Sequence, residues 1–320
     1  MTNRAGGKRR KLNQPLIKSI IVFLAATGAS IGSAVTGIGA HLGFAPMLTW
    51  MFGYAPEKAQ GTALRFSIVA AITTIVVYCE LQGRLLHSIV NHPAAIATAF
   101  SAAELHGHVF THLLRGVILV IGATIGAVSA SPITPKPTAT GLLRTLQAIA
   151  VIVSIFTITE ATHLSTVAVN HSHYALFTAL WQLLLLGIAA GAITQAGRLT
   201  GGVLLVPTLF FLTAMPDAVH GLRPLTASEA VIESLIVVLI AGLLPLWGYS
   251  QKGFVASTYL TAATLGGLIG GFAGGWLLTL LLERTILIFF GVVAMFFAAR
   301  EIARLATSTP VETSDAEHLP

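Results

Sequence analysis

Long apolar stretches are the feature that most constrains how this chain can fold. The first covers residues 16–38, about the 20 residues that a helix needs to cross the hydrocarbon core of a bilayer. Of 320 residues only 9% are charged and 55% are hydrophobic, whereas about a quarter are charged in a soluble domain. Outer-membrane barrel strands would alternate with period two over roughly ten residues, and these stretches are longer and richer in Gly and Ala. The sequence therefore predicts an all-α polytopic membrane protein.

The basic residues are concentrated at the N-terminus. The net charge is +6, and six of the eighteen Lys and Arg side chains precede or open the first apolar stretch: Arg4, Lys8, Arg9, Arg10, Lys11 and Lys18. Such a cluster favours a cytoplasmic N-terminus and contact with anionic lipid, so it does not indicate nucleic-acid binding. A cleaved signal peptide is the alternative, but its apolar region would be roughly 7–15 residues long. We expect a multi-pass protein of the inner (plasma) membrane.

Two similar segments interrupt the apolar sequence. Residues 36–48 read TGIGAHLGFAPML and residues 197–209 read GRLTGGVLLVPTL, so each combines small residues with a proline, Pro46 or Pro207. Glycine permits backbone angles closed to other residues, and the residue before proline is pushed out of the helical region. We expect a helix break in each segment, between residues 37 and 45 in the first, with a new helix starting at Pro46. Broken backbone within a membrane is tolerated only where protein or a polar cavity surrounds it, so the two breaks predict one binding site.

The remaining spans are expected at residues 57–78, 116–130 with an upstream extension, 142–158, 174–195, 224–244, 254–282 and 285–304. Residues 88–115 fit a re-entrant, an interfacial or a spanning segment. The predicted organisation is a basic disordered tail (1–15), a first transmembrane repeat (16–160), a linker (161–173), a second repeat (174–304) and a disordered tail (305–320). This gives about eight transmembrane helices in two homologous repeats with interrupted helices.

The two halves correspond beyond the glycine segments. Gly122 and Gly126 in GATIG match Gly266 and Gly270 in GGLIG. Internal duplication with interrupted helices is typical of secondary transporters, whose site lies where the repeats meet near the middle of the membrane. The alternative is that these glycines serve only close helix packing.

At these motifs the chain resembles the sulfite exporter TauE/SafE family of membrane transporters. The matching segments are Gly37 to Pro46, with glycines at 37, 39 and 43, then Ala59-Gln60-Gly61-Thr62, and Gly201-Gly202 with Leu205-Val206-Pro207. The chain departs from the family at Ala40 and His41 and at Gly221-Leu222-Arg223. The resemblance implies an exporter of small anions such as sulfite, organosulfonates or related sulfur-containing acids.

The candidate substrate-binding residues combine these motifs with arginines in apolar surroundings. They are Gly37, Gly39, His41, Pro46, Gly61, Thr62, Arg65, Arg198, Thr200, Gly201, Gly202, Pro207 and Arg223. An arginine in an apolar span is a functional candidate by default, and its planar fork fits sulfonate or carboxylate oxygens. Snorkelling to the membrane surface is the alternative.

Two glutamates are candidate coupling residues. Glu229 and Glu233 are four residues apart, so they share one helix face, and their repulsion favours holding a proton on one of them. The expected coupling ion is a proton or a sodium ion. Two acids in a wet vestibule at a helix start are the alternative. The expected partners of the protein are a small anionic substrate, the lipid bilayer and further copies of the same chain in a homo-oligomer.

Other motifs favour less specific interpretations. Glu104, His106, His108 and His112 invite a metal site, but no third ligand is fixed by spacing, and we expect no metal and no cofactor. Ser30 in GASIG matches the nucleophile pattern of serine hydrolases, yet it lies inside the first span, without the strand-to-helix turn that this pattern needs. The prediction is not an enzyme; the alternatives are an anion channel or an intramembrane serine hydrolase.

Overall fold

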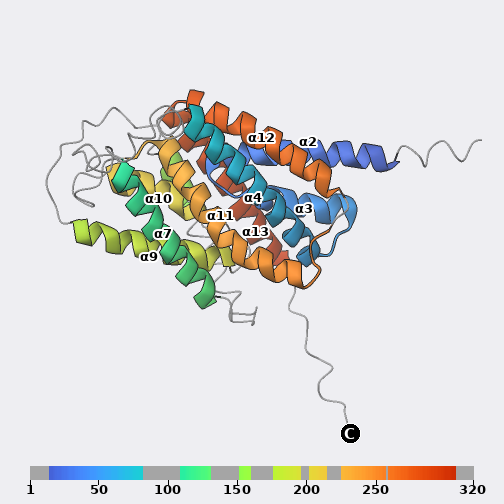
Figure 1. Cartoon of the computed structure of the whole chain (residues 1–320), viewed down its shortest axis with the longest axis horizontal. Helices are drawn as coiled ribbons and strands as arrows, with labels where there is room; N and C mark the ends of the chain where they lie inside the picture. Colours follow the sequence, from blue (N-terminus) through green and yellow to red (C-terminus); the bar gives the residue numbers. More distant parts are fainter. Residues whose placement is uncertain are drawn as a thin grey trace, which may run out of the picture.

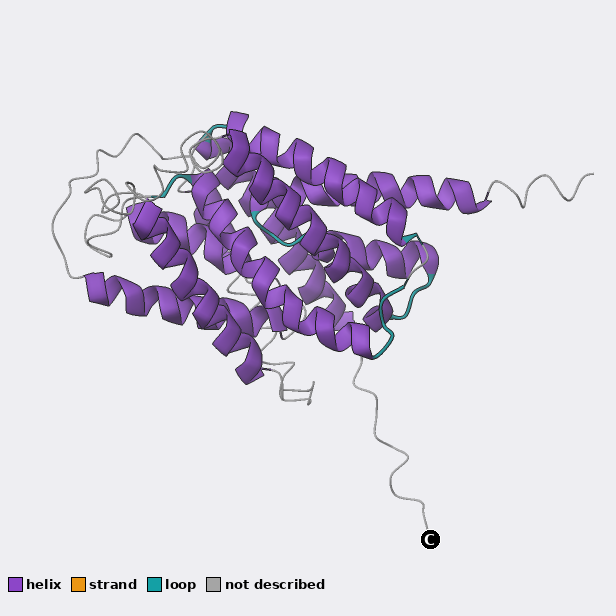
Figure 2. Ribbon diagram, viewed as in Figure 1, coloured by secondary structure: helices purple, strands orange, loops and turns teal. Residues whose placement is uncertain are grey.

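The computed structural model describes residues 14–81, 109–130, 151–159, 176–195, 202–214, 225–256 and 259–307. Every regular element in these ranges is a helix, as Figure 2 shows, and no strand occurs in them. The helices, labelled as in Figure 1, are α2 (Gln14–Thr36), α3 (His41–Phe52), α4 (Pro56–Leu81), α7 (Val109–Ala130), α9 (Leu176–Gln195), α10 (Gly202–Ala214), α11 (Ala227–Gln251), α12 (Leu260–Leu280) and α13 (Glu283–Thr307). Residues 151–159 are also helical. The all-helical fold class predicted from the sequence is confirmed.

Four of the described helices are long and apolar enough to cross a membrane. They are Leu16–Thr36 within α2, and α4, α11 and α12. Their outward faces carry large apolar side chains: Leu24 and Phe272 are each 61% exposed. A helical membrane protein needs such faces because they meet lipid. The predicted count of about eight spans stays a prediction, because the linker 161–173 and about half of the expected span 142–158 lie outside the described residues. So do the tails, except that residues 14–15 begin α2 and residues 305–307 end α13.

Helix α12 lies between α2 and α4 and touches both through glycines (Figure 1). On one face, a Cβ added to Gly270 would come within 2.7 Å of Ser30 Cβ on α2. On the other, a Cβ added to Gly271 would lie 2.7 Å from the Ala70 carbonyl oxygen on α4. Without side chains the backbones approach closely, which is how membrane helices associate when lipid is as apolar as the helices themselves.

Helices α7 and α9 make a similar contact at the other end of the bundle. Gly122 and Gly126 of α7 abut the backbone of Leu184, Gly187 and Ile188 on α9. Gly266 and Gly270, their matches on α12, abut the backbone of Phe23 and Thr27 on α2 in the same way. In both cases a helix of one half packs on the first helix of the other half, so the two halves interleave instead of forming separate bodies.

The predicted restart at Pro46 is wrong. Helix α2 ends at Thr36 and α3 already begins at His41, which makes Pro46 the sixth residue of that helix. The reason is that the amides of Leu42 and Phe44 bond to the carbonyls of Gly39 and Ala40 and start the turn before the proline. Pro207 is likewise the sixth residue of α10. Proline within membrane helices is tolerated because neighbouring groups satisfy the backbone that it frees.

Other helix boundaries differ by a few residues from those that the sequence predicts. The helix expected from residue 224 begins at Ala227, because Thr226 is extended and caps it. The span expected over 254–282 is the shorter α12, since residues 252–256 belong to the connection from α11. Part of the ambiguous segment 88–115 is helical, because α7 begins at Val109.

Candidate functional site

The break after α2 is built by Thr36 and Gly37. The Thr36 hydroxyl donates to the Gly32 carbonyl (2.7 Å) and accepts from the Ile38 amide (3.2 Å), so one side chain closes the helix and holds the next residue. Gly37 has φ +68°, in the left-handed region that favours glycine. Helix α2 therefore ends next to a glycine, the residue that most readily adopts this left-handed backbone angle.

The two glycine segments meet at this break. The Gly37 carbonyl accepts a hydrogen bond of 3.1 Å from Ser234 Oγ on α11. A Cβ on Gly37 would lie 2.8 Å from Val206 Cγ2 on α10, and a Cβ on Gly202 would press against the Gly37 carbonyl oxygen. We call this contact of Gly37, Gly202, Val206 and Ser234 the glycine junction.

Polar groups are buried at the start of α3, directly after the junction. The amides of Gly39, Ala40 and His41 precede the first turn of α3, and none of the backbone hydrogen bonds found outside the described helices uses them. His41 is only 4% exposed, and its Nδ1 has no hydrogen-bond partner in the part of the chain that the structure describes. Free amides at a helix start and an unsatisfied buried nitrogen both call for a polar ligand.

Gly61 and Thr62 hold the connection between α11 and α12. Thr62 Oγ1 donates to the Lys58 carbonyl (2.7 Å) and accepts from the Ala256 amide (2.9 Å). A Cβ on Gly61 would lie 2.6 Å from the Phe254 carbonyl oxygen. Both residues therefore have a structural contact in this state; their predicted role in binding substrate stays a prediction.

The arginines predicted to bind substrate are not gathered at the junction. Arg65 is exposed on α4, and no hydrogen bond or ion pair of its side chain occurs within the described residues. Arg198, Thr200, Gly201 and Arg223 lie outside the described residues.

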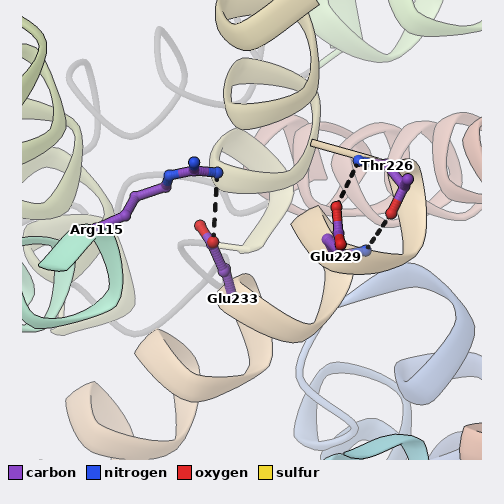
Figure 3. A network of polar contacts seen from close by, with 4 residues as sticks. All are labelled: Arg115, Thr226, Glu229 and Glu233. Carbon is purple, nitrogen blue, oxygen red and sulfur yellow. Dashed lines mark hydrogen bonds and ion pairs between the residues drawn. The ribbon is translucent and has the colours of Figure 1, made fainter. Parts of the chain in front are cut away.

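Glu229 caps the start of α11. Its carboxylate accepts from the Thr226 amide (3.0 Å), while its own amide donates to Thr226 Oγ1 (3.2 Å), as Figure 3 shows. This capping box satisfies two amides that the first helical turn leaves free. Ser228 extends the group, since its Oγ lies 3.1 Å from Thr226 Oγ1 and accepts from the Tyr78 hydroxyl at 3.1 Å.

Glu233 points away from Glu229 toward α7 (Figure 3). Its Oε1 lies 3.5 Å from Nη1 of Arg115, and the two side chains are 7% and 0% exposed. The prediction that Glu229 and Glu233 act as one acidic pair therefore does not describe this state, since each carboxylate has its own contact on a different side of α11.

Arg115 is the functional candidate that sequence reasoning missed. Arg115 follows Glu104, His106, His108 and His112, and in such a polar stretch an arginine does not stand out. The available signal was its position one residue before the apolar stretch that contains Gly122. Glu104, His106 and His108 lie outside the described residues.

Ser30 lies within the continuous helix α2 and is fully buried. It faces Gly270 of α12, so it does not sit on the exposed strand-to-helix turn from which a hydrolase serine acts.

In comparisons with known proteins, no protein-family model, no curated protein and no solved structure matches this chain. The resemblance to the TauE/SafE family thus rests on the motifs of the chain itself and stays a prediction.

Proposed function

We propose that this protein is a secondary transporter that carries small anions across the membrane by alternating access at the glycine junction. The observation that carries the proposal is the start of α3, where the amides of Gly39, Ala40 and His41 and the buried Nδ1 of His41 adjoin the broken backbone. A helix start combines free N–H groups with the positive end of the helix dipole, an arrangement that favours anion binding.

The position of the break supports transport rather than a fixed structural role. Its surroundings come from both halves of the chain: α2 and α3 on one side, α10 and α11 on the other. Interrupted helices at such a meeting point are the usual substrate sites of secondary transporters. Gly37 and Gly202 are in contact in this state, and the proposal requires α10 and α11 to move away from Gly37 when the site opens.

The proposed substrates are sulfite, organosulfonates and related sulfur-containing acids, moved outward with a proton or a sodium ion as the coupling ion. This choice rests on the resemblance to the TauE/SafE family. It agrees with a site of N–H donors, because sulfonate and sulfite offer several oxygens to such donors.

The test is anion flux in proteoliposomes with sulfite, methanesulfonate, sulfoacetate, sulfate and acetate as probes. We expect saturable flux of at least one sulfur-containing anion. Gly39→Val and His41→Gln should lower it at least tenfold, whereas Gly53→Ala, in open space at the end of α3, should not.

Several results would contradict the proposal. Full flux in both Gly39→Val and His41→Gln would place the site elsewhere. Conductance far above carrier turnover, without counter-transport, would make the protein an anion channel. Hydrolysis by the purified protein that is lost in Ser30→Ala would make it an enzyme.

A further inference from the structure

We propose that Arg115 supplies the positive charge that holds the transported anion, and that Glu233 releases Arg115 to the anion by taking up a proton. This inference rests on the proposed transport function and deepens it, because it assigns the coupling ion and a binding residue.

The Arg115–Glu233 pair is buried between α7 and α11 (Figure 3). An ionisable side chain at a helix centre costs roughly 2.5–3.5 kcal/mol on insertion scales, so two of them inside the bundle indicate a function by default. Arginine keeps its proton at all physiological pH values, which makes Glu233 the member of the pair that can change charge.

The pair lies close to the glycine junction along α11. Glu233 directly precedes Ser234, whose hydroxyl donates to the Gly37 carbonyl. Successive residues of a helix are about 100° and 1.5 Å apart, so the two side chains leave α11 at one level in different directions. A small shift of α11 would therefore act on the junction and on the ion pair together.

Charge balance determines which ions move together. In the observed state, Arg115 and Glu233 neutralise one another. A bound anion would leave one negative charge in excess in a low-dielectric interior, which is costly. When Glu233 binds one proton, its carboxyl becomes neutral and the anion takes its place beside the guanidinium. One monovalent anion then moves with one proton, and no net charge crosses the membrane.

The observed contact suits a pair that must separate. The 3.5 Å between Nη1 and Oε1 exceeds the roughly 2.7–2.9 Å of a charge-assisted hydrogen bond. A pair that serves only to fasten α7 to α11 would be replaceable, since apolar residues of similar volume are often as stable as a buried ion pair. The two roles thus predict different behaviour of a double apolar variant.

Few other titratable groups face this part of α11 in the described residues. Neither α9 nor α10 contains one along its described length, α2 has only the exposed Lys18, and α7 has only His112 besides Arg115. On α4 the Tyr78 hydroxyl donates to Ser228, and on α11 the Glu229 carboxylate caps the helix. Glu283, the exposed first residue of α13, has its pKa raised by partial desolvation and then by the charge of Glu229.

The first experiment measures flux of the best transported anion of the panel in proteoliposomes, with imposed pH gradients and imposed potassium diffusion potentials. In the unaltered protein a pH gradient should drive that anion uphill, and for a monovalent anion such as methanesulfonate a potential should not. Glu233→Gln imitates the protonated side chain, so it should still exchange anion for anion but lose the drive by pH at least tenfold. Glu283→Gln is the control and should keep that drive.

The second experiment tests whether the Arg115–Glu233 pair serves transport or only holds α7 against α11. Arg115→Met combined with Glu233→Leu should give a folded protein, judged by size exclusion and by the unfolding temperature in detergent, with flux lowered at least tenfold. Recovery of flux in this double variant, or a full pH drive in Glu233→Gln, would overturn the inference and leave the transport proposal standing. If the double variant does not fold, the pH drive measured in Glu233→Gln alone decides whether the inference holds. Absence of anion flux in the unaltered protein would overturn both proposals.

Discussion

Gly37 is constrained by its backbone angles and by its neighbours at once. Its φ of +68° disfavours any side chain, and Val206 and Ser234 leave no room for a methyl group. Gly53 has nearly the same angle, φ +65°, but open space around it. Comparing substitutions at Gly37 and Gly53 therefore distinguishes the cost of backbone strain from the cost of crowding by neighbouring side chains.

We expect Gly37→Ala to lower stability more than Gly53→Ala. The left-handed angle costs about 1–2 kcal/mol in both variants, and overpacking adds roughly 1–3 kcal/mol at residue 37 only. Thermal unfolding in detergent measures the difference. Equal losses in the two variants would mean that α10 and α11 do not press on Gly37.

The capping box gives a second prediction at this scale. Thr226→Ala removes the hydroxyl that accepts from the Glu229 amide, and should lower stability by about 0.5–2 kcal/mol, the usual cost of a lost cap. Thr226→Ser keeps that oxygen, so its unfolding temperature should stay close to that of the unaltered protein. An unchanged unfolding temperature in Thr226→Ala would show that water replaces the cap.

Glu283 should make stability depend on pH. Glu283 is exposed at the start of α13, but partial desolvation and then the nearby Glu229 raise the pKa of its carboxyl in the folded protein, so folding slightly favours the protonated form. The stability that this group contributes is present in acid and is lost as pH rises through the folded pKa. Glu283→Gln should flatten this part of the profile and raise the unfolding temperature at neutral pH. A profile with the same slope in both proteins would contradict this.

At the scale of elements, α12 is a helix with two glycine faces. Its sequence predicted a span with close packing, but not that Gly266 and Gly270 would face α2 while Gly267 and Gly271 face α4. Glycines at neighbouring positions leave the choice of partner open, because both faces of the helix are equally bare. The partner helices settle that choice through their own small residues, such as Ala26 and Ala70.

Gly270→Ala should destabilise the protein although alanine is the better helix former. The added methyl would stand 2.7 Å from Ser30 Cβ and closer still to the Thr27 backbone, so α2 and α12 must move apart, at roughly 1–3 kcal/mol. Gly28→Ala on α2 is the control: nothing lies within 4 Å, so it should be neutral or gain up to about 1 kcal/mol. The same result for both variants would show that the glycines of α12 do not set the contact.

The sequence located the first break to within a few residues but misplaced the restart of the helix. Glycine and the pre-proline rule identify where a helix is weak, while the first turn of α3 is fixed by the amides of Leu42 and Phe44, which no composition reveals. Arg115 was missed for a related reason, since its partner Glu233 is far away in the chain and only the packing of α7 on α11 brings them together.

For the whole molecule, the order of contacts predicts that both termini lie on one side of the membrane. Glu283 at the start of α13 is near Glu229 on α11. Five residues further along α11, Ser234 meets the end of α2 at Gly37. Further along α13, Phe297 lies level with Ala29, as both touch the site of Gly43. Helix α13 thus runs roughly antiparallel to α2, so its C-terminal end points toward the side of the membrane on which α2 begins.

Reporter fusions at residue 1 and residue 320 should both report the cytoplasm. The basic tail, Lys18, Arg300 and Arg304 are then on the side that retains positive charge. Arg300 also stacks 5.6 Å from the ring centre of the exposed Trp50, an arrangement typical of the membrane surface. Reporters active on opposite faces would contradict this topology.

The glycine contacts of α12 also bear on how the chain is made. Helices α2 and α4 enter the membrane early in synthesis, but the helix that fills the space between them is almost the last to leave the ribosome. Until then, only lipid or another helix of the chain can cover the small-residue faces of α2 and α4. Contacts between residues so far apart in sequence form late in folding. The nascent protein therefore waits in an incomplete form for most of its translation, and insertion factors and proteases have that interval in which to act on it.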